Sequence, residues 1–136
     1  TNMYAMFEDC SKLEILNLKN FNTKNVVAMS MMFYNCQSLK SLNLSKFKTS
    51  SLKDIYQMFG YCFSLETLDL TSFDVSKVID NYGLCSDCKN LKTVKLPDTL
   101  FSLNKDMFLF TENLKEIYWK NKKYNVEDII TYDEVY

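Results

Sequence analysis

Apolar and polar residues alternate in short blocks that recur every 26 residues along the chain, except that the last block follows after 23. Each block holds three apolar positions, of which the last two are separated by one polar residue. The five blocks are Leu13, Leu16 and Leu18; Leu39, Leu42 and Leu44; Leu65, Leu68 and Leu70; Leu91, Val94 and Leu96; and Leu114, Ile117 and Trp119. Alternation of this kind is typical of a strand with one buried face. The pattern predicts five short strands that pair in parallel and in register.

Between these blocks the spacing of apolar residues changes. In residues 26–36 and 52–62 the apolar positions recur at offsets of 3, 6, 7 and 10, which is one face of a helix. Thr23 and Thr49 stand where a helix N-cap would be. Residues 78–88 repeat the pattern more weakly. We therefore expect a short helix between successive strands.

A fixed period of this length indicates a unit that is stacked on copies of itself. The predicted fold is an α/β, right-handed leucine-rich-repeat solenoid of about five coils, with a parallel sheet on one side and short helices on the other. It covers residues 1–119. Residues 120–136 are expected to cap the last coil through a basic turn at 120–123 and a short helix at 126–130. Met3, Met6 and Phe7 match positions inside later repeats, so further repeats are expected upstream.

Composition narrows the possible functions. The chain has 136 residues, 47% of them hydrophobic, and contains no histidine. Histidine-based acid–base catalysis, nucleophile activation by histidine and most zinc or iron sites are thereby removed. We expect no enzyme activity and no cofactor. An enzyme would need paired carboxylates in a deep cleft. Asp69 has no acidic neighbour at the equivalent positions of the other repeats, which are Asn17, Asn43, Lys95 and Tyr118.

Charge argues against a nucleic-acid partner, and the short apolar runs argue against a membrane-spanning segment. Sixteen lysines, with no arginine, oppose seventeen acidic residues, giving a net charge of −1. A nucleic-acid-binding protein would be expected to carry a basic stripe, usually with arginines. No apolar run approaches the roughly 18 residues that span a bilayer. The sequence predicts neither nucleic-acid binding nor direct membrane insertion in this segment.

Four cysteines share one position of the repeat: Cys10, Cys36, Cys62 and Cys88. We expect a structural ladder of buried thiols, because in-register side chains lie about 4.8 Å apart whereas a disulfide prefers about 3.8 Å between Cβ atoms. A disulfide ladder is the alternative. Cys85 and Cys88 also form a C-x-x-C pair, for which a metal or redox role is a further alternative.

The outward positions of the predicted strands are the candidate partner-binding residues. One column comprises Asn17, Asn43, Asp69, Lys95 and Tyr118; the neighbouring column supplies Ser41, Thr67 and Thr93, with Ile15 and Glu116 at its ends. Stacked repeats commonly bind partners on such a surface. The alternative is a solvated face that only keeps the protein soluble. The tyrosines near the C-terminus, Tyr118, Tyr124, Tyr132 and Tyr136, form either an interface or part of the cap.

The motif M-F-x-x-C-x-x-L-x-x-L-x-L-x-x-F-x-(T/V) occupies residues 6–23, 32–49 and 58–75. It resembles the BspA-like leucine-rich repeats of bacterial surface proteins and of mycoplasma-type lipoproteins. This resemblance implies an extracellular, surface-attached module without enzymatic activity, used for adhesion or for binding a host or extracellular-matrix protein. A structural spacer that displays another domain is the alternative function.

Overall fold

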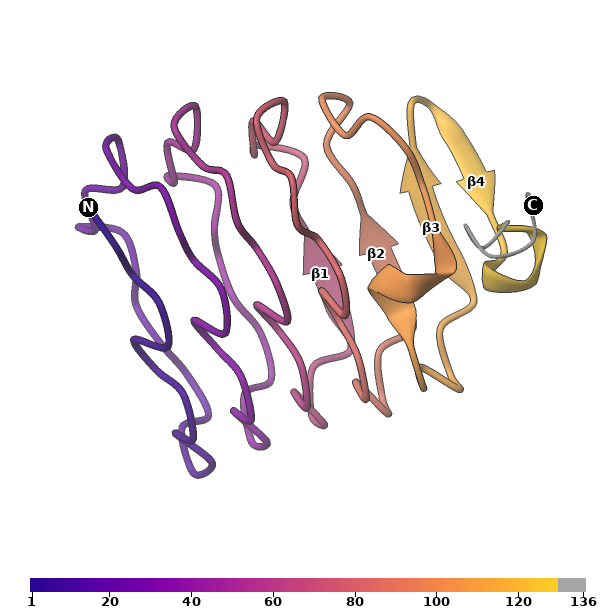
Figure 1. Ribbon diagram of the computed structural model, residues 1–136. Coiled ribbons are helices and arrows are strands. Elements are labelled where there is room, and N and C mark those ends of the chain that lie inside the picture. Colours follow the sequence, from indigo (N-terminus) through magenta and orange to yellow (C-terminus); the bar gives the residue numbers. More distant parts are fainter. Residues whose placement is uncertain (130–136) are drawn as a thin grey trace.

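A computed structural model describes residues 1–129 of the chain, in which successive turns of backbone lie side by side (Figure 1). Parallel bridges join equivalent residues of neighbouring turns, from Asn2 to Ala28, from Ala28 to Asp54 and from Asp54 to Asp80. The stack is therefore held by hydrogen bonds between residues that are one repeat apart.

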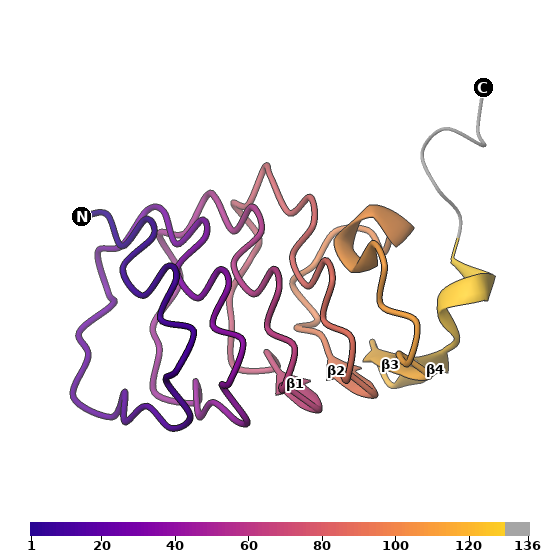
Figure 2. The same cartoon turned by 90° about the horizontal axis from the view of Figure 1, so that it is seen from below.

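The regular elements gather in the C-terminal half. They are β1 (Thr67–Asp69), β2 (Thr93–Lys95), the 3-10 helix η1 (Lys105–Phe108), β3 (Glu116–Trp119), β4 (Lys122–Tyr124) and the 3-10 helix η2 (Val126–Asp128). The four strands form one sheet in the order β1-β2-β3-β4 along one side of the stack (Figure 2). The first three are parallel, whereas β4 is antiparallel to β3.

The predicted fold class, an α/β leucine-rich-repeat solenoid of five coils, is wrong. The helical segments among residues 1–129 are η1 and η2 alone, of four and three residues. The sheet is mixed and four-stranded rather than five-stranded and parallel. No strand forms at residues 16–18 or 42–44, and β4 was not predicted. The structure therefore does not place a helical layer opposite a five-stranded sheet.

The segments that were expected to be helices fold instead as chains of tight turns. Within residues 29–36, the N–H groups of Met32 and Tyr34 bond to carbonyls three residues back, while those of Met31 and Phe33 donate to the next turn of chain. A helix would direct every N–H to the residue four back. Tight turns and helices bury residues at the same spacing, so periodicity alone cannot separate them.

Backbone conformation explains why no helix continues through these segments. Left-handed residues recur at two positions of the repeat, namely Ala5, Met31, Gln57 and Gly83, and four residues later Asp9, Asn35, Tyr61 and Asp87. A left-handed residue breaks a right-handed helix. Only one of the eight is glycine, so the hydrogen bonds to the neighbouring turns must offset the strain at the other seven.

The predicted helix N-caps have a different role. The Thr23 hydroxyl donates to the Lys48 carbonyl oxygen at 3.0 Å and accepts the Lys48 N–H at 2.7 Å. The Thr49 hydroxyl accepts the Asp74 N–H at 2.7 Å. Both side chains are buried and join neighbouring turns of the chain. They therefore hold the stack together instead of starting a helix.

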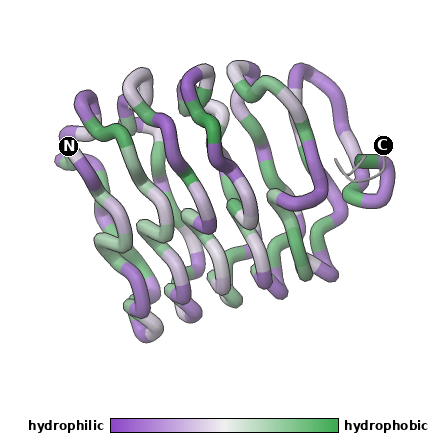
Figure 3. Tube along the Cα trace, viewed as in Figure 1, coloured by the Kyte–Doolittle hydropathy of each residue, from purple (hydrophilic) through white to green (hydrophobic). Residues whose placement is uncertain are grey.

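The core consists of the repeated apolar positions, as Figure 3 shows for matching places in successive turns. Leu39, Leu65 and Leu91 are fully buried. The rings of Phe33 and Phe59 stack with centroids 5.5 Å apart and an interplanar angle of 8°. Each fully buried side chain of this size stabilises the fold by about 1.5–3 kcal/mol.

The C-terminal part is only partly as expected. Lys120 and Asn121 form the turn of a hairpin between β3 and β4, both with positive φ, as a two-residue type I′ turn requires. Lys122 and Lys123, expected in that turn, belong to β4. Of the predicted helix at 126–130, only residues 126–128 are helical, as the 3-10 helix η2, and Ile129 is extended. Residue 130 lies outside the described part, as do Tyr132 and Tyr136. The division at residue 119 stays a prediction.

Candidate functional site

The outer surface of the strand side carries three open hollows that adjoin one another in a row. Their volumes are about 440, 210 and 570 Å³. The first and second hollows share Asn43, and the second and third share Thr71. We call this surface the strand-side trough. It crosses successive turns of the chain, so a ligand lying in it would contact several repeats at once.

The trough contains most of the residues predicted to bind a partner. The first hollow is lined by Asn17, Ser41 and Asn43, the second by Asn43 and Asp69, and the third by Thr93, Lys95 and Tyr118. Thr67 is exposed but lines none of the three. The structure thus brings seven of the eight predicted residues into one surface feature.

Three of these residues have a local structural role. The side-chain Oδ1 atoms of Asn17, Asn43 and Asp69 accept the backbone N–H two residues later, at 3.1, 3.1 and 3.0 Å. This is an Asx-turn, which ends an extended segment and directs the chain into the next corner. Each side chain therefore has part of its hydrogen-bonding capacity occupied before any partner arrives.

Ion pairs link neighbouring turns along the same side. Lys40 pairs with Glu14 at 2.7 Å and Lys92 with Glu66 at 2.8 Å. Hydrogen bonding and the nearby Lys40 ammonium lower the pKa of Glu14. All four side chains are more than half exposed, so solvent screens both pairs and they add little to stability.

Asp69 and Lys95 lie at the centre of the predicted column, 3.9 Å apart. Partial burial raises the pKa of Asp69, but hydrogen bonds from Thr71 and the Lys95 charge outweigh burial and leave that pKa below its usual range. Asp69 is therefore a carboxylate at neutral pH and does not act as a proton donor there.

Lys95 apart, the lysines of the trough were not among the predicted partner-binding residues. Lys19 and Lys46 line the first hollow, and Lys120 and Lys122 join Lys95 in the third. Against them stand Asp69, Asp98 and Glu116, of which Asp69 and Glu116 are already paired with lysines. These lysines lie just beyond the predicted strands, at corners whose direction the sequence pattern does not specify. The trough is therefore more basic than the predicted columns.

Trp119 adds an aromatic wall to the third hollow. Its indole Nε1 is buried without a hydrogen-bond partner among the described residues. The Lys120 ammonium lies 4.4 Å from the Trp119 ring centroid, a cation–π contact.

The predicted cysteine ladder lies in the interior of the stack. All five cysteines are free, and Cys36, Cys62 and Cys88 are fully buried, whereas Cys10 is half-buried. Burial raises the pKa of Cys36 to about 11. Cys85, the other half of the C-x-x-C pair, is also fully buried, and burial raises its pKa well above the usual value.

The side chains of the trough include amides, hydroxyls, lysines, aromatic rings and the carboxylates of Asp69, Asp98 and Glu116. Within residues 1–129 no group of three or more cysteine or acidic side chains is placed to hold a metal ion. No helix of the same residues has the length and apolar character needed to cross a bilayer.

Comparison with known proteins gives a family. The sequence model of the family described as "Mycoplasma protein of unknown function, DUF285" matches residues 1–116. The chain belongs to this family, which agrees with the expected bacterial repeat-type protein. No curated protein and no solved structure matches the chain significantly.

Proposed function

We propose that the chain is a non-enzymatic recognition module that binds a partner protein in the strand-side trough. The observation that carries this proposal is the row of adjoining hollows across the stacked turns, lined by lysines beyond those paired to carboxylates. A surface that crosses several turns suits an extended segment of another protein better than a small molecule. An acidic segment would pair with Lys19, Lys46, Lys120 and Lys122.

The cell-surface location and the class of partner rest on resemblance. The three in-phase copies of the repeat motif resemble BspA-like surface proteins, and the family match adds a mycoplasma origin for relatives of the chain. These two observations support an extracellular module that adheres to a host or extracellular-matrix protein. Antibody labelling of intact cells that express the protein tests the location, and labelling only after lysis would contradict it.

Binding is tested with immobilised fibronectin, laminin, fibrinogen and collagen in biolayer interferometry. The variant changes Lys19, Lys46, Lys120 and Lys122 to Gln, which removes charge but keeps length. The control changes Lys24 and Lys77, exposed lysines that line none of the three hollows. We expect capture that weakens about tenfold in the trough variant alone. Equal capture by both variants would remove the trough from consideration.

A structural spacer is the second candidate. The Asx-turns of Asn17, Asn43 and Asp69 support it, because they give these polar side chains a purpose without any ligand. A spacer would capture none of the four matrix proteins. It would still unfold cooperatively as a stack.

A further inference from the structure

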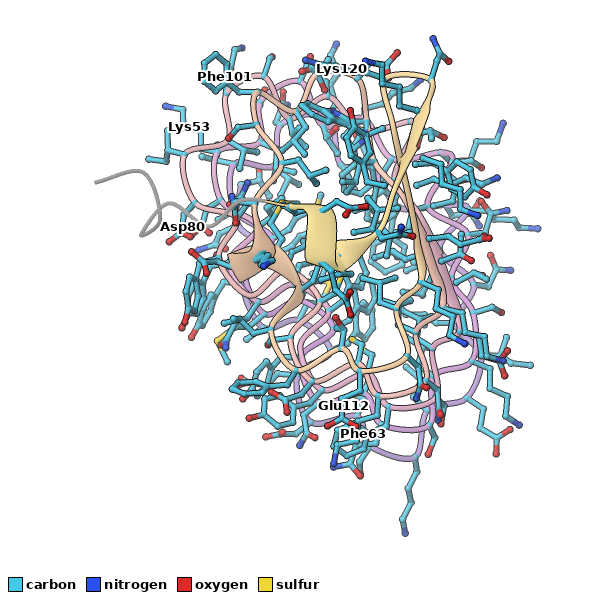
Figure 4. All side chains as sticks on the ribbon, turned by 90° about the vertical axis from the view of Figure 1, so that its right-hand side faces the viewer. Lys53, Phe63, Asp80, Phe101, Glu112 and Lys120 are labelled. Atoms are coloured by element: carbon cyan, nitrogen blue, oxygen red, sulfur yellow. The ribbon has the colours of Figure 1, made fainter. Side chains whose placement is uncertain are left out.

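A second surface lies away from the strands, on the tight-turn segments. It exposes five tyrosine rings, wholly or in part, and we call it the tyrosine face: Tyr4, Tyr34, Tyr56, Tyr61 and Tyr82. Asp80, whose carboxylate accepts the Tyr82 N–H, is labelled in Figure 4 on the side of the stack away from the strands. These tyrosines are distinct from the C-terminal tyrosines that the sequence offered as an interface. The signal was present, since Tyr4, Tyr56 and Tyr82 occupy one position of the repeat.

The rings of this face are held in place. Tyr56 and Tyr82 stack with centroids 6.1 Å apart and an interplanar angle of 14°. Tyr34 and Tyr61 meet edge to face at 5.3 Å. Gly60 leaves the space that Tyr34 occupies, because a Cβ at Gly60 would lie 3.0 Å from that ring. Rings ordered before binding lose little entropy when a partner docks.

Carboxylate side chains lie in the same segments as the tyrosine rings. Asp54 Oδ1 accepts the Tyr56 N–H at 2.9 Å, and Asp80 Oδ1 accepts the Tyr82 N–H at 3.1 Å, so each Asx-turn sets an acid beside a tyrosine. Asp9 and Asp87 lie in the same turn segments. The ion pairs among residues 1–129 all involve the strand side, and none includes these four acids.

A buried hydroxyl group lies beneath the tyrosine face. Ser86 is only 4% exposed, and its hydroxyl has no hydrogen-bond partner among the described residues. It lies 3.2 Å from the position that a Cβ of Gly60 would take, next to the Tyr34 ring. Buried hydroxyls are normally paired, so an open one beneath an aromatic surface points to a missing acceptor.

We propose that the tyrosine face binds an extended basic segment of another polypeptide. Lysine or arginine side chains would lie over the tyrosine rings and pair with Asp54 and Asp80. The chain already makes such contacts itself, with Lys89 5.1 Å from the Phe63 ring centroid. The carboxylates of this face have the charge complementary to such cations, whereas the strand-side trough carries lysines and suits an acidic ligand.

Spacing defines the partner further. Neighbouring stacked rings are 6.1 Å apart, and an extended chain advances about 3.3 Å per residue. Alternate residues of an extended segment are thus separated by nearly the ring spacing. The expected ligand carries cations at every second position and runs across the turns.

The test uses fluorescence anisotropy with a labelled ten-residue peptide of alternating Lys and Ser. A second peptide has the same composition with all lysines in one block. The binding variants are Asp54→Asn with Asp80→Asn, which keeps both Asx-turns, and Tyr56→Leu with Tyr82→Leu. The control is Asp74→Asn with Glu127→Gln, two acids outside both this face and the strand-side trough. Urea unfolding checks that each variant folds.

We expect the alternating peptide to bind more tightly than the block peptide. Each binding variant should weaken its binding about tenfold, with the control within about twofold of the wild type. Three results would overturn the proposal: equal loss in the control, no loss in either binding variant, or equal binding of the two peptides. Sedimentation without peptide tests whether a second copy of the chain occupies the face instead. Self-association that is sensitive to salt and lost in the Asp54 and Asp80 variant would assign the face to that second copy.

Discussion

The thiol of Cys62 donates a hydrogen bond to the carbonyl oxygen of Phe33, 3.2 Å away and one repeat earlier in the chain. Cys36 makes the same contact with Phe7 at 3.1 Å, and Cys88 with Phe59 at 2.9 Å. The Phe33 carbonyl also accepts the N–H of Cys36 at 3.2 Å. Each thiol therefore links two neighbouring turns at the point where a tight-turn segment ends.

Cys62→Ala should lower the free energy of unfolding by about 1–3 kcal/mol, because it removes this hydrogen bond and leaves a cavity in the core. Urea denaturation measures the change. Cys10→Ala is the matched control, since Cys10 is only half-buried, and its effect should be clearly smaller. Equal effects of the two substitutions would mean that burial and the thiol hydrogen bond do not add to the free energy of unfolding at Cys62.

Alkaline pH should destabilise the fold. Burial raises the pKa of Cys36 from 9.0 to about 11, so between these values the folded state holds a proton that the unfolded state releases. Stability contributed by this group is complete below the unfolded-state pKa and is lost as pH rises through the folded-state value. Urea unfolding at pH 8, 9, 10 and 11 should show the decline. Cys36→Ala should decline less steeply, and an identical decline would contradict the prediction.

Leu68→Asp should prevent folding. Leu68 lies in the middle of β1, is 3% exposed and pairs with Val94 of β2. A carboxylate there would be buried without a partner, which costs several kcal/mol. Thr67→Asp, one residue away on the exposed side, should change stability by about 0.5 kcal/mol or less. Circular dichroism during thermal unfolding compares the two, and a cooperative transition for Leu68→Asp near the wild-type temperature would refute the assigned register.

Phe110→Gly should stabilise the protein. Phe110 is 71% exposed and has a φ of 57°, a conformation that costs an L-residue about 1–2 kcal/mol and glycine almost nothing. Phe101 is 93% exposed and does not have a positive φ, so Phe101→Gly should destabilise slightly through the entropy of the unfolded chain. Opposite shifts in the midpoint of urea unfolding are expected. Shifts of the same sign would show that backbone strain at Phe110 is not relieved by glycine.

The sequence by itself determined which residues are inside. The repeat period, the buried columns through Leu39, Leu65 and Leu91, and the burial of Cys36, Cys62 and Cys88 all follow from where apolar residues recur. The outward positions Asn17, Asn43 and Asp69 follow in the same way. Burial depends on side-chain chemistry, and side-chain chemistry is written directly in the order of residues.

The backbone conformation between those positions depends on the tertiary structure. Residues 29–36 have helical spacing, yet Met31 and Asn35 are left-handed, and alternate N–H groups bond to the next turn of chain. The same holds for Thr23, which pairs with Lys48 in the neighbouring turn instead of capping a helix. These hydrogen bonds join residues one repeat apart, so neither a local pattern nor a propensity could reveal them. The trough and the tyrosine face exist only because stacking brings such distant residues together.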